Sequence, residues 1–122
     1  MKRWLPSFLA FAFVGAMIYL ANFGYAVEFF SAAQRSGADK LGHFALFGGL
    51  ALVLNVSLAC RAWRGWLIGS GVVALVATLE EWSHSWIPHR NFDLLDLAAN
   101  YAGIGVGGLL ARWIWARRPP AA

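Results

Sequence analysis

Acidic and basic side chains gather in three short groups of this sequence, and each group stands at one end of an apolar stretch. A carboxylate beside an imidazole can exchange protons near neutral pH, and both are ligands for polar groups or cations. These residue types therefore point to acid–base chemistry or ligand binding. The groups are Asp39, Lys40 and His43, then Glu80, Glu81 and His84, then Arg90, Asp93, Asp96 and Asn100.

Helical spacing indicates which of these side chains share a helix face. Asp39 and His43 are four residues apart, and so are Asp96 and Asn100, whereas Glu81 precedes His84 by three. Residues at these spacings are neighbours on a helix surface. The hypothesis is that catalysis falls to Glu81, His84, His43 and Asp96, and ligand binding to Asp39, Lys40, Arg90 and Asn100.

Glu80 and Glu81 are adjacent, so their side chains leave a helix about 100° apart. We expect one of them to face the cluster and the other a neighbouring helix or the rim. The sequence does not decide between them, since both stand at a helical spacing from His84.

Structural roles are the alternative for several of these residues. Asp39 could cap the second apolar stretch, and Asp93 could cap the fourth, with Asp96 at its third position. Arg90 could pair with Asp96 or Glu81. Capping does not explain the carboxylates within the third stretch.

A metal site is a further alternative, because imidazole and carboxylate groups together suit a first-row cation. The sequence contains no His-Glu-x-x-His or His-x-x-Glu-His motif, so neither a metal nor any other cofactor is assigned. The candidate ligands are Asp39, Glu81, Asp96, His43 and His84.

The elements that would position these groups are membrane spans. Of 122 residues, 60% are hydrophobic and 13% are charged, which is typical of an integral membrane protein. A spanning helix needs about 20 apolar residues. The sequence predicts an all-α fold, a single membrane domain over 1–122, built as a polytopic bundle of four transmembrane helices at about 4–22, 41–60, 66–86 and 94–116.

The first apolar stretch has a second interpretation, a cleaved signal peptide over residues 1–26. Lys2 and Arg3 precede it, and Gly24-Tyr25-Ala26 offers a small-x-small cleavage pattern. The apolar run exceeds the 7–15 residues usual for a signal peptide, which favours a retained span.

Basic residues predict the orientation by the positive-inside rule. Seven of them fall on the side of both termini, and three fall on the other side. We therefore expect both termini in the cytoplasm of a bacterium, the chain in its inner membrane, and the polar groups facing outside. The net charge of +4 fits this topology and does not call for nucleic acid. The seven are Lys2, Arg3, Arg61, Arg64, Arg112, Arg117 and Arg118, and the three are Arg35, Lys40 and Arg90.

Small residues recur at every fourth position of the last stretch. They are Ala99, Gly103, Gly107 and Ala111. Such a stripe lets another helix approach closely. Helix packing is therefore the role expected of these four residues.

The order of the polar motifs over residues 39–108 resembles the VanZ-like family of small bacterial membrane proteins. The usual pattern of the family has glutamine where this sequence has His84. The resemblance implies a four-helix envelope protein, of a family linked to reduced susceptibility to teicoplanin. No enzymatic reaction is firmly assigned to this fold. The motifs are Asp39-Lys40-x-x-His43-Phe44, Glu81-x-x-His84, Pro88-x-Arg90 and Asp96-x-x-x-Asn100-x-x-Gly103-x-x-x-Gly107.

The leading hypothesis is a membrane protein whose outward-facing site binds or modifies an envelope component, such as a lipid-linked or cell-wall intermediate. A small proton-coupled transporter or channel subunit is the second hypothesis, and a non-catalytic scaffold is the third. Whether the protein is an enzyme, and in which oligomeric state it acts, is not decided by the sequence.

Overall fold

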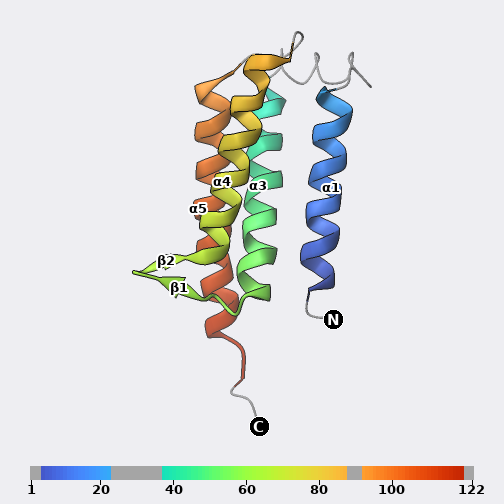
Figure 1. The fold of residues 1–122 in the computed structure, drawn as a ribbon. Coiled ribbons are helices and arrows are strands. Elements are labelled where there is room, and N and C mark those ends of the chain that lie inside the picture. The colour runs from blue at the N-terminus through green and yellow to red at the C-terminus, as the bar shows by residue number, and fades with distance from the viewer. Residues whose placement is uncertain (1–3, 23–36, 88–91, 120–122) are drawn as a thin grey trace.

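The computed structural model describes residues 4–22, 37–87 and 92–119, which form an antiparallel bundle of α-helices with a small β-hairpin (Figure 1). Helices α3, α4 and α5 pack against one another, and α1 packs mainly on α3. Helix α1 begins and helix α5 ends at the end of the bundle that carries the hairpin. The elements are α1 (Leu5–Asn22), α3 (Ala38–Ser57), β1 (Ala62–Trp63), β2 (Trp66–Leu67), α4 (Ile68–Ser83), the 3₁₀ helix η1 (His84–Trp86) and α5 (Leu94–Ala116).

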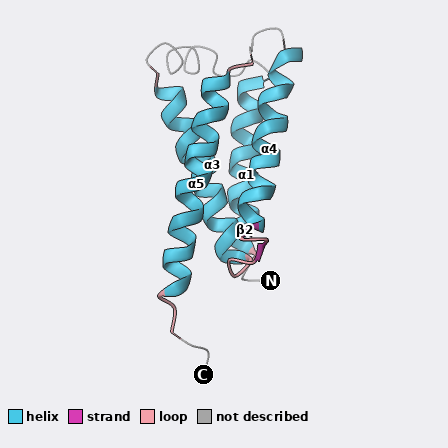
Figure 2. Cartoon of the chain, turned by 90° about the vertical axis from the view of Figure 1, so that its left-hand side faces the viewer, coloured by secondary structure: helices cyan, strands magenta, loops and turns pink. Residues whose placement is uncertain are grey.

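Two of these helices, α3 and α5, are long and apolar enough to cross a membrane. Helix α1 contributes a shorter apolar run, Leu5–Leu20, and α4 has 16 residues. Figure 2 shows the four long helices aligned along one direction. The described residues thus form a mostly helical bundle, as the sequence predicts.

Helix boundaries agree with the prediction for α5 and differ for α3. The predicted span 41–60 is a helix over Ala38–Ser57, followed by residues in the left-handed region at Ala59 (φ 56°) and Cys60 (φ 52°). The Cys60 N–H donates to the Asn55 carbonyl oxygen at 2.8 Å. This bond from residue i to residue i−5 is typical of the Schellman motif at the C-terminus of a helix.

The connection between α3 and α4 corrects the purely α-helical prediction. Strands β1 and β2 pair antiparallel, with Trp63 opposite Trp66. The two residues between them have positive φ, 52° at Arg64 and 84° at Gly65, as a type I′ turn requires. Part of the predicted span 66–86 is therefore a strand, and α4 begins only at Ile68.

Glycines set the distance between α3 and α5. A Cβ added to Gly103 would strike the backbone of Phe44, and one added to Gly107 would strike the backbone of Gly48. Ala111 is fully buried farther along the same stripe of α5, and Ala99 is partly buried. The two helices thus touch backbone to backbone, which fixes α3 and α5 relative to each other next to the polar residues.

Candidate functional site

The polar residues of α3, α4 and α5 meet at the end of the bundle where α3 and α5 begin and α4 ends (Figure 1). Lys40 links α3 to α5: its Nζ lies 2.9 Å from Asp93 Oδ2 and 2.5 Å from Asp96 Oδ1. It also donates to Asp39 at 3.2 Å. Three carboxylates thus surround one ammonium group, and Lys40 is engaged by them rather than open to an incoming anion.

His43 makes a second link between α3 and α5. Its Nδ1 lies 2.9 Å from Asn100 Oδ1, and because an amide oxygen only accepts, Nδ1 carries the proton. The other ring nitrogen, Nε2, lies 3.7 Å from Asp96 Oδ2. Asn100 is completely buried, and within the described part of the chain its Nδ2 has no hydrogen-bond partner.

Glu81 joins α4 to this group and is completely buried. Its Oε1 accepts hydrogen bonds from the Asp93 backbone N–H at 2.9 Å and from His84 Nδ1 at 3.2 Å. Its Oε2 is buried and has no partner among the described residues. A carboxylate so placed retains unused lone pairs in a region that excludes water.

His84 contacts both neighbouring glutamates, which corrects the expectation that only one of them faces the cluster. Its Nε2 lies 2.5 Å from Glu80 Oε1, while its Nδ1 contacts Glu81. The glutamates precede His84 by three and four residues, and both positions border it on a helix surface. His84 is itself buried, with 1% of its surface exposed.

The two predicted helix caps have different outcomes. The Asp93 side chain accepts from the Leu95 N–H at 2.8 Å, which confirms the cap on α5. The hydrogen bond from Lys40, together with this cap, lowers the pKa of Asp93. The predicted Asp39 cap is wrong, because α3 begins two residues earlier than such a cap would allow: Gly37 is the capping residue, and Asp39 stands in the first turn.

Negative charge predominates at this end of the bundle. Among the described residues it holds five carboxylates and the single lysine, besides two histidines. Arg90, expected as a clamp and as a ligand-binding residue, lies outside the described residues. The five carboxylates are those of Asp39, Glu80, Glu81, Asp93 and Asp96.

Two sets of side chains could hold a metal ion in the described part of the chain. One joins His43, Glu81 and Asp96 from three helices, and the other joins Glu80, Glu81 and His84 from one polypeptide turn. In each set the candidate ligand atoms lie within 4.8 Å of one another. Asp39, which the sequence offered as a ligand, belongs to neither set.

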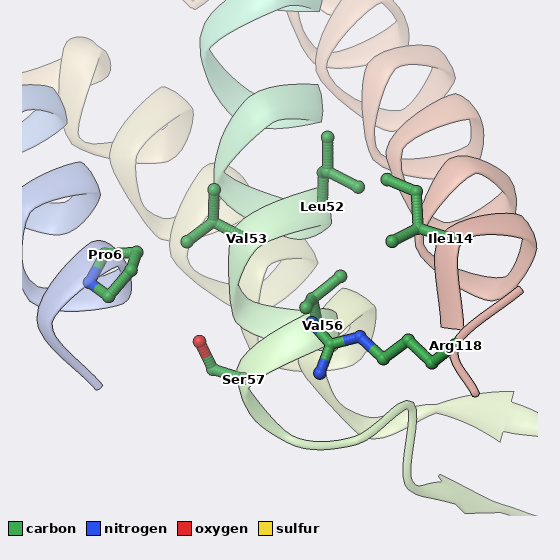
Figure 3. Close-up of a pocket in the computed structure, with 7 residues that line it drawn as sticks. All are labelled: Pro6, Leu52, Val53, Val56, Ser57, Ile114 and Arg118. Carbon is green, nitrogen blue, oxygen red and sulfur yellow. The ribbon is translucent and has the colours of Figure 1, made fainter. Parts of the chain in front are cut away.

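The opposite end of the bundle carries a different feature, an apolar groove of about 530 Å³ (Figure 3). Arg118 reaches across its edge below Val56. Nearby, Ser7 Oγ and Ser57 Oγ lie 2.7 Å apart and tie α1 to α3. Sequence reasoning did not find this contact, because neither serine stands in a recognisable motif. The groove is lined by Pro6, Leu52, Val53, Val56, Ser57, Ile114 and Arg118.

No known protein family, curated protein or solved structure matches this chain.

Proposed function

We propose that this protein is a four-span bacterial inner-membrane protein of the VanZ-like type. At the outer end of its bundle it binds or acts on a polar component of the cell envelope. The observation that carries the proposal is Glu81, a carboxylate with no exposed surface and an oxygen that lacks a partner among the described residues.

The surface of the bundle supports a membrane location. Large apolar side chains face outward on several helices, among them Phe8 (69% exposed), Leu75 (60%) and Leu109 (69%). Soluble proteins seldom expose so much apolar surface, whereas lipid covers it favourably. Because α1 and α4 expose such side chains as α5 does, a bilayer crossed by all four helices accounts for the surface of the whole bundle.

The distribution of charge supports the orientation. Arg61 and Arg64 lie in the connection between α3 and α4, and Arg117 follows α5, all at the end of the bundle opposite the carboxylates. By the positive-inside rule this end faces the cytoplasm. The carboxylate end then faces the outside, where envelope components are found.

A buried carboxylate in a membrane protein is costly, so its presence supports a role other than packing. Apolar residues of similar volume would fill the same space with equal or better stability. Side-chain exposure decreases from the surface of the site inward. The side chains of Lys40 and Asp93 are each 32% exposed, whereas the side chain of Glu81 is buried. A polar head group arriving at the membrane surface would meet Lys40 and Asp93 first and Glu81 last.

His43 and Asp96 supply the chemistry that such a head group would encounter beside Glu81. With Nδ1 donating to Asn100, the Nε2 of His43 is the nitrogen available to accept a proton. Carboxylates within the same group can accept or return that proton. This arrangement suits general acid–base chemistry on a bound hydroxyl group.

A transporter is less well supported by the interior of the bundle. Between the carboxylate end and the Asn55–Ser70 hydrogen bonds of the other end lie buried apolar side chains, including Leu50 (1% exposed) and Val73 (0%). The described residues thus offer no continuous polar path from one end to the other. A site at one membrane face fits this interior better.

The proposal is tested by Glu81→Gln, which keeps the shape of the side chain and removes its charge. Glu80→Gln is the matched control, because it makes the same chemical change one residue away. In a strain from which this gene is deleted, the unsubstituted gene should restore the original glycopeptide susceptibility. We expect the Glu81→Gln gene not to restore it, although the amount of protein in the membrane is unchanged. A fully active Glu81→Gln variant would refute the proposal and favour a scaffold.

A further inference from the structure

Three acceptor atoms from three helices converge behind Lys40. These atoms lie within 4.8 Å of one another. They are a ring nitrogen of His43 on α3, a carboxylate oxygen of Glu81 on α4 and a carboxylate oxygen of Asp96 on α5. Bringing two carboxylates together in a buried place is unfavourable unless positive charge lies between or beside them. Lys40 supplies positive charge to Asp96 from one side. A cation held among the three acceptor atoms would offset the charge of Glu81 as well.

Hydrogen bonds leave lone pairs of this group unused. His43 directs its Nδ1–H at Asn100, so its Nε2 presents a lone pair, and the 3.7 Å separation from Asp96 Oδ2 is too long for a hydrogen bond. In Glu81 the Oε1 already accepts two hydrogen bonds, and Oε2 is buried without a partner among the described residues. The unpaired oxygen of a completely buried side chain is the second observation that points to a ligand.

The surrounding contacts resemble those that orient metal ligands. A ligating histidine usually donates its other ring N–H to an oxygen, as His43 does to Asn100. Ligating carboxylates are in turn held by hydrogen bonds, as Glu81 is by the Asp93 backbone and Asp96 by Lys40. All three candidate ligands are thus oriented by residues that are not ligands themselves.

We propose that His43, Glu81 and Asp96 bind one divalent first-row cation, such as Mn²⁺ or Zn²⁺, within the site of the proposed function, on which this inference rests. One imidazole nitrogen and two carboxylate oxygens are donors that these ions accept. Three protein ligands leave further coordination positions for water or for an oxygen of a bound head group. With the ion on its Nε2, His43 would not accept a proton, and water bound to the ion would take over that role.

The other set of candidate ligands is less suitable. Both ring nitrogens of His84 already point at carboxylate oxygens, at 2.5 Å from Glu80 and 3.2 Å from Glu81. A metal ion there would have to displace one of these contacts. His84 therefore acts as a hydrogen-bonding support for Glu81, and Glu80 is left out of the metal site.

Metal titration of the full-length protein in detergent tests the inference. After removal of metal with a chelator, Co²⁺ is added and followed by its visible absorption, and Mn²⁺ and Zn²⁺ are titrated by calorimetry. We expect saturation at about one ion per chain. Glu81→Gln, Asp96→Asn and His43→Gln should each weaken binding about 100-fold or more, and Glu80→Gln should leave it unchanged.

Several outcomes would overturn the inference. They are an absence of saturable binding to the unsubstituted protein, equal binding by all variants, or loss of binding in Glu80→Gln but not in His43→Gln. If a ligand variant does not yield folded protein, Asn100→Ala decides, because it leaves the three ligands in place. It should weaken Co²⁺ binding about 10- to 100-fold through loss of the bond to His43, and an unchanged affinity would contradict the site.

Failure of the metal site and failure of the proposed function give different results. If Glu81→Gln abolishes the envelope phenotype while the unsubstituted protein binds no metal, only the metal site is wrong. If the unsubstituted protein binds metal through these residues and Glu81→Gln keeps the phenotype, only the proposed function is wrong.

Discussion

The backbone contact between α3 and α5 makes a quantitative prediction about two glycines of the same helix. Gly103 faces α3, and a Cβ there would strike the carbonyl group and Cα of Phe44. Gly105 stands two residues farther along α5, and a Cβ there would meet nothing within 4 Å. Gly103→Ala and Gly105→Ala therefore make the same chemical change in two different surroundings.

The expected difference in stability follows from these surroundings. Both substitutions gain about 1 kcal/mol of helix propensity, so this contribution cancels in a comparison of the two variants. Overpacking a filled contact costs about 1–3 kcal/mol, and the upper part of this range applies at Gly103 because the obstacle is backbone rather than a flexible side chain. Gly103→Ala should thus be less stable than Gly105→Ala by about 3 kcal/mol.

Thermal unfolding in detergent measures this difference. For a chain of this length, about 3 kcal/mol corresponds to melting temperatures about 10 °C apart. Gly105→Ala should melt at or above the temperature of the unsubstituted protein. Gly103→Ala should also weaken any ligand binding, because Phe44 adjoins His43 and Gly103 lies one turn from Asn100. Equal melting temperatures for the two variants would refute the close contact.

Three further predictions concern sidedness, coupling and thiol reactivity. In intact cells and a cysteine-free background, Phe92→Cys should react with an impermeant thiol reagent and Trp63→Cys should not; both positions are exposed, so the reverse pattern would contradict the proposed orientation. The change in unfolding free energy of the double variant Glu81→Gln, Asp96→Asn should differ from the sum of the two single changes by about 0.5–3 kcal/mol. A double variant equal to that sum would show that the two side chains act separately. Burial raises the pKa of the Cys60 thiol despite nearby arginines, so a smaller fraction of Cys60 is thiolate at a given pH. In permeabilised membranes Cys60 should therefore be alkylated more slowly than the cysteine of Trp63→Cys, and equal rates would contradict this.

The sequence predicted the main helices and the meeting of their polar ends, because both follow from local regularities. The bounds of α5 match the prediction because Asp93 is a strong capping residue and no proline interrupts the 23 residues that follow it. Antiparallel threading then brings Asp96 and Asn100 beside His43.

Features that depend on backbone reversals or on exact rotations were not predictable in this way. The hairpin requires positive φ at Arg64, a residue without a strong preference for that conformation, so only Gly65 signalled the turn. The shared contact of Glu80 and Glu81 with His84 depends on side-chain rotamers, which spacing alone does not fix. The cap of α3 moved to Gly37 because the helix begins before the apolar stretch does.

The contacts of His84 bear on how the protein enters the membrane. In the proposed topology the carboxylate end of α4 crosses the bilayer, and until α5 packs beside it the Asp93 N–H is not in place to donate to Glu81. The contacts of His84 with Glu80 and Glu81 lie within one helical turn and form as soon as that turn does. With a proton on each ring nitrogen, His84 donates to both carboxylates. Helix α4 and η1 thus bring one oxygen of each carboxylate a partner before α5 packs, and α5 then adds the hydrogen bond from the Asp93 backbone.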